Sequence, residues 1–349
     1  MKFQSFLRLA RSIAFTLASL QLGALALAAE ATFVDAPGRR DIAYDATRKV
    51  LYISGGDYLL RYDVAAKTFL TPVPVGGMTL GMDISPDGNT LAVANSAIGV
   101  AINPTNQINF VNLATLAVTH QTFPLEFMEG GTFTVAYDRQ AKLLVSSQFQ
   151  GSGWVPLRKY DPATRQVGVL GSVRQDSMLS PSSDGSVIAI AESNISNGPY
   201  GFYKTRDNSY RSLYFTGWFN FEIAVSARGA QAAVPTYGGT FIQDPAHVFP
   251  LVGEYAGVAP IGAAYGRNSV YFPMANTNYV AEYDMETMTE VRRLTMPRQF
   301  QWGGNSAFGN GRTKVASDNS YLFVTVDGGV AVQKLRIRRG GGVAGDADD

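Results

Sequence analysis

The stretch Gly81–Asn95 reads GMDISPDGNTLAVAN and sets the pattern for the rest of the chain. A short apolar segment leads into a polar turn at Ser85–Gly88, and a run rich in apolar residues follows the turn. Two apolar segments on either side of an Asp-Gly turn are typical of a β-hairpin. This stretch therefore predicts two neighbouring antiparallel strands.

The same unit recurs along the chain. Asp41–Ser54 and Thr134–Ser146 are clear copies, and weaker copies lie around Asp184, Arg228, Gly266 and Asp318. Seven copies at a spacing of about 45 residues are the pattern of a propeller built from four-stranded blades. No segment after residue 29 carries apolar residues at helical spacing. We expect an all-β fold, a seven-bladed β-propeller over residues 30–339.

The last copy supplies three strands rather than four, near Lys314–Ser317, Tyr321–Val326 and Val330–Ile337. Ala31–Val34 precedes the first unit and is free to supply the missing outer strand of the last blade. Such a closure removes a sheet edge that would otherwise invite aggregation. The glycine-rich residues 340–349 are expected to be a disordered tail.

The first 29 residues have the features of a secretory signal peptide. Lys2, Arg8 and Arg11 form a basic start, an uncharged stretch follows, and small residues end it at Ala28-Ala29. The alternative is a membrane anchor, but Ser, Thr and Gln residues dilute the hydrophobicity of the stretch. We expect cleavage, a periplasmic or secreted bacterial protein, and no membrane span in the mature chain.

Composition excludes several kinds of site. The 349 residues contain no Cys and two His, which excludes disulfides, thiolate metal centres and thiol catalysis. Without the first 29 residues the chain carries 26 basic and 28 acidic residues, so the charge gives no attraction to nucleic acid. Nucleic acid is therefore an unlikely partner by composition, and a small molecule or a periplasmic protein is expected instead.

The loops that lead into the inner strands are expected to ring the mouth of the central channel. Candidate ligand-binding residues there are Arg39, Arg40, Asp41, Asp83 and Lys314. We place Asp41 and Asp83 at the same position of neighbouring repeats, where two carboxylates can hold a divalent cation or a polar ligand. The alternative is a ring of salt bridges that only stabilises the channel.

The regular aspartates of the hairpin turns are expected to be structural. A carboxylate in such a turn accepts hydrogen bonds from nearby main-chain N–H groups. We expect these turns to lie on the face away from the functional site. The residues are Asp45, Asp87, Asp138, Asp184 and Asp318.

Glu222 is the candidate catalytic acid. It lies in the apolar stretch Trp218–Val225, where burial would raise the pKa of its carboxyl and suit it to proton transfer. The alternative is a buried glutamate that pairs with an arginine.

Further ligand-binding candidates lie on the long loops between second and third strands and on the connection before the last copy. Asn and aromatic side chains on loops above a rigid scaffold suit recognition. These candidates are Asn95, Trp154, Tyr237, Asn276 and Trp302.

Ile84–Asn95 resembles the core of the YVTN-type repeats of bacterial secreted propellers, with a Ser-Pro-Asp-Gly turn followed by an apolar strand that ends in Ala-Asn. The resemblance implies a seven-bladed propeller. The family it resembles includes binding proteins, lactonases and the large subunits of quinone-dependent amine dehydrogenases.

Three hypotheses about function follow. The first is a periplasmic or secreted binding or scaffold protein that presents its loop face to a ligand or partner protein. The second is an enzyme at the channel mouth, a lactonase-like hydrolase or a lyase that uses Glu222 or the Asp41 and Asp83 pair. The third is a non-redox large subunit of a quinone-dependent amine dehydrogenase.

Overall fold

The computed structural model describes residues 31–96, 105–192, 197–243, 251–254, 260–300, 308 and 311–335. All of them belong to the compact unit Ala31–Asp349. The expected signal peptide, the expected tail and Trp302 lie outside the described residues.

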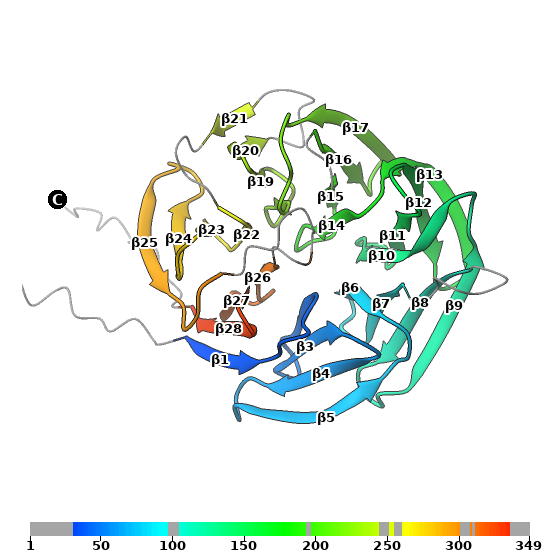
Figure 1. Ribbon diagram of the computed structural model, residues 1–349, viewed down its shortest axis with the longest axis horizontal. Coiled ribbons are helices and arrows are strands. Elements are labelled where there is room, and N and C mark those ends of the chain that lie inside the picture. The colour runs from blue at the N-terminus through cyan, green and yellow to red at the C-terminus, as the bar shows by residue number, and fades with distance from the viewer. Residues whose placement is uncertain are drawn as a thin grey trace, which may run out of the picture. The chain divides into compact units, whose positions relative to one another are not determined.

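The described strands form seven four-stranded antiparallel sheets, arranged as blades around a central axis (Figure 1). In blades 1 to 6 the four strands follow one another in sequence from the axis outward. The strands of blades 1 to 3 are β2 (Ile42–Asp45), β3 (Val50–Gly55), β4 (Tyr58–Asp63) and β5 (Thr68–Pro74); β6 (Thr79–Ile84), β7 (Thr90–Asn95), β8 (Thr105–Asn112) and β9 (Val118–Pro124); and β10 (Glu129–Tyr137), β11 (Leu143–Phe149), β12 (Trp154–Asp161) and β13 (Gln166–Arg174). The all-β, seven-bladed prediction is confirmed.

Blades 4 to 6 repeat this order, although the inner strands of blades 5 and 6 have only two residues each. Their strands are β14 (Ser177–Pro181), β15 (Val187–Glu192), β16 (Pro199–Lys204) and β17 (Ser209–Phe215); β18 (Ala224–Val225), β19 (Ala232–Thr236), β20 (Gly239–Gln243) and β21 (Leu251–Glu254); and β22 (Ala264–Tyr265), β23 (Ser269–Pro273), β24 (Tyr279–Asp284) and β25 (Glu290–Thr295).

Blade 7 joins the two ends of the propeller. It contains β26 (Thr313–Val315), β27 (Tyr321–Val326) and β28 (Gly329–Lys334) from the C-terminal part of the chain, and β1 (Thr32–Asp35) is its outer strand. β1 pairs antiparallel with β28, with Thr32 opposite Val332 and Asp35 opposite Gly329. The predicted closure of the last blade by the N-terminal strand is confirmed.

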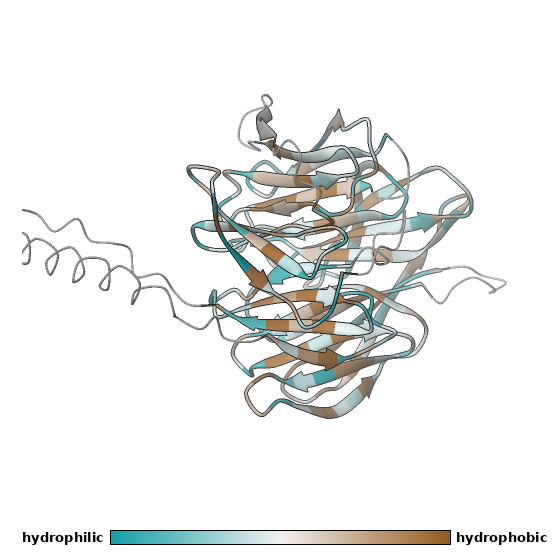
Figure 2. Cartoon of the chain, turned by 60° about the vertical axis from the view of Figure 1, so that its left-hand side comes forward, coloured by the Kyte–Doolittle hydropathy of each residue, from teal (hydrophilic) through white to brown (hydrophobic). Residues whose placement is uncertain are grey.

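Apolar side chains pack between neighbouring blades, and Figure 2 shows hydrophobic residues distributed along the strands. Between blades 1 and 2, for example, Tyr52, Leu59, Met82 and Leu91 are buried in one cluster. Each side chain buried in this way contributes about 1.5–3 kcal/mol relative to an exposed one. The blades therefore hold one another in place, and the inner strands have fixed positions around the axis.

The hairpin turns between first and second strands have the expected conformation. Asp45 accepts hydrogen bonds from the main-chain N–H groups of Thr47 and Arg48. Gly88 has a positive φ of 69°, a conformation that costs glycine little. The turn aspartates thus have a structural role.

Candidate functional site in the central channel

The inner strands of the seven blades can be aligned by the residue that closes each hairpin turn. In blade 2 this residue is Ser85, whose N–H donates to the carbonyl of Thr90, and the other blades have an equivalent pair. Four residues before it each blade contributes one member of a set that we call the floor ring: Asp41, Gly81, Thr134, Met178, Glu222, Gly262 and Arg312. Two residues before it lies a second set, the wall ring: Ala43, Asp83, Ala136, Ser180, Ala224, Ala264 and Lys314.

The expectation that Asp41 and Asp83 share one repeat position is wrong. Ile42 is paired with Ile53 and Met82 with Val93, so Asp41 is equivalent to Gly81 and Asp83 is equivalent to Ala43. Asp41 instead shares its position with Glu222 and Arg312, and Asp83 shares its position with Lys314. The floor ring therefore holds two carboxylates and one cation, and the wall ring holds one of each.

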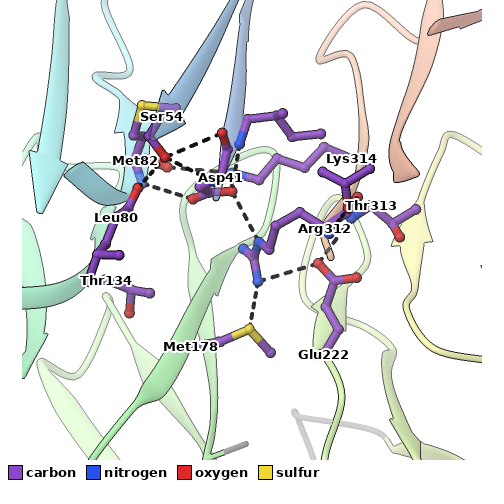
Figure 3. A network of polar contacts seen from close by, with 12 residues as sticks. Asp41, Ser54, Leu80, Met82, Thr134, Met178, Glu222, Arg312, Thr313 and Lys314 are labelled. Atoms are coloured by element: carbon purple, nitrogen blue, oxygen red, sulfur yellow. Dashed lines mark hydrogen bonds and ion pairs between the residues drawn. The ribbon is translucent and has the colours of Figure 1, made fainter. Parts of the chain in front are cut away.

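Arg312 is the centre of the floor ring (Figure 3). Its Nε lies 3.1 Å from Oδ1 of Asp41, and its Nη1 lies 3.4 Å from Oε1 of Glu222. Nη1 also lies 2.9 Å from Sδ of Met178. One buried guanidinium from blade 7 thus contacts side chains of blades 1, 4 and 5. The sequence places both Arg312 and Lys314 at the entry of the last inner strand, but we named only Lys314 as a candidate ligand-binding residue.

The glycines of the floor ring make room for this network. A Cβ atom at Gly262 would lie 2.6 Å from Oε2 of Glu222, and one at Gly81 would lie 2.8 Å from Cα of Thr134. Real Cβ atoms do not approach other atoms so closely. The floor ring is therefore filled by its larger side chains.

The three acidic side chains also bind the main chain of other blades. Oδ2 of Asp41 accepts from the N–H of Met82 at 2.8 Å, and Oδ2 of Asp83 accepts from the N–H of Tyr137 at 2.7 Å. Glu222 accepts from the N–H groups of Ala263 and Thr313, both at 3.2 Å. An inner strand has no strand partner on its axial side, so these carboxylates satisfy N–H groups that would otherwise lack an acceptor.

Above the floor ring lies a cavity of about 570 Å³. Its wall is formed by Asp83 and Lys314 together with the small side chains of Ala43, Ser180, Ala224 and Ala264, and Arg312 and Glu222 also line it. The mouth is formed by the hairpin turns, and the turn residues there are Asp45, Ala46, Thr47, Ser85, Pro86, Asp87, Gly88, Arg139, Ser182, Ser183, Asp184, Gly185 and Ser317.

The cavity therefore opens on the face of the hairpin turns. We expected that face to lie away from the functional site, and this expectation stays a prediction. On the other side of the floor ring, Phe308 packs against Phe133, with ring centroids 5.0 Å apart, and belongs to one buried cluster with Leu80 and Met178. Because most members of the wall ring have small side chains, the cavity lies on the turn side of the floor ring.

Burial raises the pKa of two carboxyls that line the cavity. The pKa of Glu222 rises to about 7, because its burial outweighs the opposing effects of Arg312 and two main-chain N–H groups. The pKa of Asp83 rises to about 6 for the same reason, against the opposing charge of Lys314. Both groups thus titrate near neutral pH.

The pKa of Asp41 moves the other way. Burial acts to raise it, but Lys314, Arg312 and the N–H groups of Met82 and Ile42 together hold it below its ordinary value. Nζ of Lys314 lies 3.4 Å from Oδ1 of Asp41. Asp41 is therefore an ionised acceptor below the cavity.

The two arginines predicted beside the channel are not brought to the cavity. Arg39 is buried and Arg40 is exposed, and neither lines the cavity. The divalent-cation hypothesis for Asp41 and Asp83 stays a prediction. In the part of the chain that the structure describes, no three His, Cys, Asp or Glu residues group as metal ligands do.

The loop-face candidates have different surroundings. Asn95 is buried, and its side chain accepts from the N–H of Met78 and donates to the carbonyl of Gly76, so it stabilises a connection between blades. Asn276 is exposed in a turn at a φ of 57°, which asparagine tolerates. Trp154 and Tyr237 are exposed, and Tyr237 stacks on Trp218 with ring centroids 6.1 Å apart.

Most of the exposed large apolar side chains of the described residues lie on this loop face. They occur where a chain segment leads into an inner strand or joins a second to a third strand. They are Tyr58, Met78, Phe127, Trp154, Phe215, Trp218 and Tyr237. The molecule thus has an aromatic loop face and, opposite it, a polar cavity.

Comparison with known proteins shows the fold alone. No protein-family model and no curated protein matches the chain. Solved structures do match. A chain of Kuenenia stuttgartiensis hydrazine synthase is 13% identical, with a TM-score of 0.63 over 88% of this chain and 98% of that chain. The Cps50 (Swd1) β-propeller domain of Myceliophteria thermophila is 11% identical, with a TM-score of 0.63 over 87% and 98%.

A chain of a mitotic checkpoint complex is 9% identical, with a TM-score of 0.65 over 88% of this chain and 91% of that chain. These three neighbours belong to different proteins and complexes, so the shared fold does not select a function. The resemblance to YVTN-type repeats stays a prediction. No helix among the described residues is long and apolar enough to cross a membrane.

Proposed function

We propose that this protein is a binding propeller that takes a small polar ligand into its central cavity through the turn face. The observation that carries the proposal is the cavity itself: about 570 Å³, with Asp83 and Lys314 set in a wall of small side chains. Ligand pockets commonly have about 300–1,000 Å³ and a few placed polar groups. The volume lies within this range, and Asp83 and Lys314 are polar groups of this kind.

The contacts of Glu222 favour binding over catalysis. Its carboxylate is held by two main-chain N–H groups and by Arg312, which is the buried ion pair that we gave as the alternative to a catalytic role. An enzyme of the lactonase or lyase type stays the competing hypothesis, because a carboxyl with a pKa of about 7 can accept a proton. Turnover of a lactone that is abolished in Glu222→Gln would establish it.

The binding proposal is tested with a cavity-filling variant. Ser180→Leu places an apolar side chain in the cavity wall, and Ser172→Leu makes the same change at an exposed position of the outer strand β13. A panel of amines, carboxylates, polyols and amino acids is screened by thermal shift and calorimetry. We expect at least one compound to bind the unaltered protein and Ser172→Leu, and binding to be lost in Ser180→Leu. Equal binding to both variants would place the ligand elsewhere.

A second candidate function is docking of a partner protein on the loop face. Its support is the set of exposed apolar side chains on that face, among which Trp218 and Tyr237 stack on each other. A photo-crosslinking residue at position 237 should trap a partner in extracts of the native source. The same residue at position 169, on the outer strand β13, is the control, and identical products from both positions would contradict docking.

We also propose that the protein acts in the periplasm or outside the cell. The support is the basic start, uncharged stretch and small residues of positions 1–29. Sequencing the N-terminus of the protein from its source checks this, and a chain that starts at Met1 would contradict it.

A further inference from the structure

The charges of the two rings do not balance. The floor and wall rings hold three carboxylates, Asp41, Asp83 and Glu222, and two cations, Arg312 and Lys314. The remaining members of both rings are uncharged. With all five groups ionised, the centre of the channel carries one net negative charge, and a cation that enters the cavity would balance it.

Asp83 is the carboxylate of the two rings that has no ion-pair partner among the described residues. Arg312 lies between Asp41 and Glu222, and Nζ of Lys314 lies 3.4 Å from Oδ1 of Asp41 and from the carbonyl of Met82. Within the described ranges, no lysine or arginine nitrogen comes within ion-pair distance of the Asp83 carboxylate. Its two oxygens accept only from the N–H groups of Ile84 and Tyr137, so acceptor capacity remains on the cavity side.

The cavity wall combines apolar side chains with the polar Ser180 and Lys314. Ala43 comes from the preceding blade, and Ala224 and Ala264 lie across the cavity, with all three lining it. These side chains offer no hydrogen bond to a ligand, and they are small enough to leave space for a short carbon chain. A ligand that satisfies the site therefore has one charged end and an aliphatic body.

We propose that the cavity selects a small organic ammonium ion, whose charged group binds Asp83 and whose carbon chain lies against Ala43, Ala224 and Ala264. This inference rests on the proposed function and names the charge and class of its ligand. The ammonium supplies the positive charge that the two rings lack.

The ionisation of the cavity gives the proposal a second consequence. Asp83 faces Lys314 and Asp41, and Glu222 faces Arg312 and Lys314, while the mouth adds Asp45 with its partner Arg48, Asp87, Asp184 and Arg139. Asp83 and Glu222 have pKa values raised by burial, so each carries a bound proton for part of the time near neutral pH. A cation favours their ionised forms, so its binding releases protons and strengthens as pH rises from about 5.5 to 8.

The test uses three probes of equal length: n-butylammonium, butanol and butyrate. Butylammonium stays protonated across this pH range, as a lysine side chain does. Its dissociation constant is measured by calorimetry in buffers of different ionisation enthalpy, with ligand-observed NMR for weak binding. We expect it to bind at least about tenfold tighter than the other two probes, with proton release. In Asp83→Asn the preference should disappear.

Asp57→Asn is the matched control, because Asp57 is exposed on the loop face. It should leave the preference unchanged, and circular dichroism and the melting temperature show whether each variant is folded. Butanol or butyrate binding as tightly as butylammonium would overturn the ammonium inference and leave small-ligand binding intact. If no compound of the wider panel binds either, the proposed function fails with it. If Asp83→Asn still prefers butylammonium over butanol and butyrate, the assignment of the ammonium site to Asp83 is refuted.

Discussion

Arg312→Met removes the guanidinium that holds the floor ring together and keeps an unbranched side chain of similar width. Arg312, Asp41 and Glu222 are each at most 3% exposed. The substitution therefore leaves two buried carboxylates that have lost their closest cation, and it creates no compensating contact.

The magnitude follows from the remaining contacts. Removing one partner of a buried ion pair typically costs about 3–5 kcal/mol of unfolding free energy. Asp41 keeps Lys314 at 3.4 Å and two main-chain N–H groups, and Glu222 can take up a proton because its pKa is about 7. We therefore expect a loss near the lower end, about 3 kcal/mol, at neutral pH.

The assay is unfolding in urea, followed by tryptophan fluorescence, for the unaltered protein, Arg312→Met and the double variant Arg312→Met/Glu222→Gln. The double variant should regain part of the loss, because it removes one of the two uncompensated carboxylates. Arg293→Met is the control, because Arg293 pairs with Glu290 on the exposed surface and should not move the unfolding midpoint.

The pH dependence has a definite sign. The folded-state pKa of Asp41 lies below its ordinary value, so its ion pair adds stability above that value and loses it as pH falls through the lowered pKa. The difference in unfolding free energy between the unaltered protein and Arg312→Met should therefore become smaller below about pH 4. A loss under about 1 kcal/mol at neutral pH, as an exposed pair would give, would refute the role assigned to Arg312.

Three further outcomes are expected. Gly262→Ala should lower the unfolding free energy by about 1–3 kcal/mol in a urea titration, because its Cβ would lie against Glu222; no loss would contradict the packing of the floor ring. Glu222→Gln should flatten the decrease in melting temperature between about pH 5 and 8, since a carboxyl with a raised folded pKa of about 7 reduces stability as pH rises through this range; parallel profiles would exclude that pKa. Val34→Asp buries a charge in β1 and should lower the unfolding free energy by more than about 3 kcal/mol, seen as a lower yield of soluble protein and a lower melting temperature. An unchanged melting temperature would contradict the closure of blade 7 by β1.

The fold was predictable because a local sequence pattern marks each blade. A polar turn between two apolar runs, such as that at Asp87-Gly88, recurs once per blade, and the last copy is one strand short. The missing strand had an apolar candidate in Ala31–Val34, and a sheet edge left open is costly. Strand number, blade number and closure all follow from such local patterns.

The site was harder to predict because it depends on the alignment of the inner strands. The turn aspartate does not occupy one position: Asp45 closes the hairpin of blade 1, whereas Asp87 lies two residues beyond Ser85, which closes the hairpin of blade 2. An alignment through the turn aspartates therefore slips by two residues, and this slip placed Asp41 beside Asp83. The open side of the channel depends on the small side chains of the wall ring and on Phe308, and neither carries a motif.

The pairing of β1 with β28 has a consequence for the order in which the protein is made. β1 leaves the ribosome first, but its partner strand Gly329–Lys334 is among the last described segments to be synthesised. Throughout translation the first strand has no neighbour in its own sheet, and a chain that stops before Gly329 cannot form a closed ring. The propeller thus closes only after β28 has been made, and a product truncated before β28 exposes unpaired strand edges for quality control to recognise.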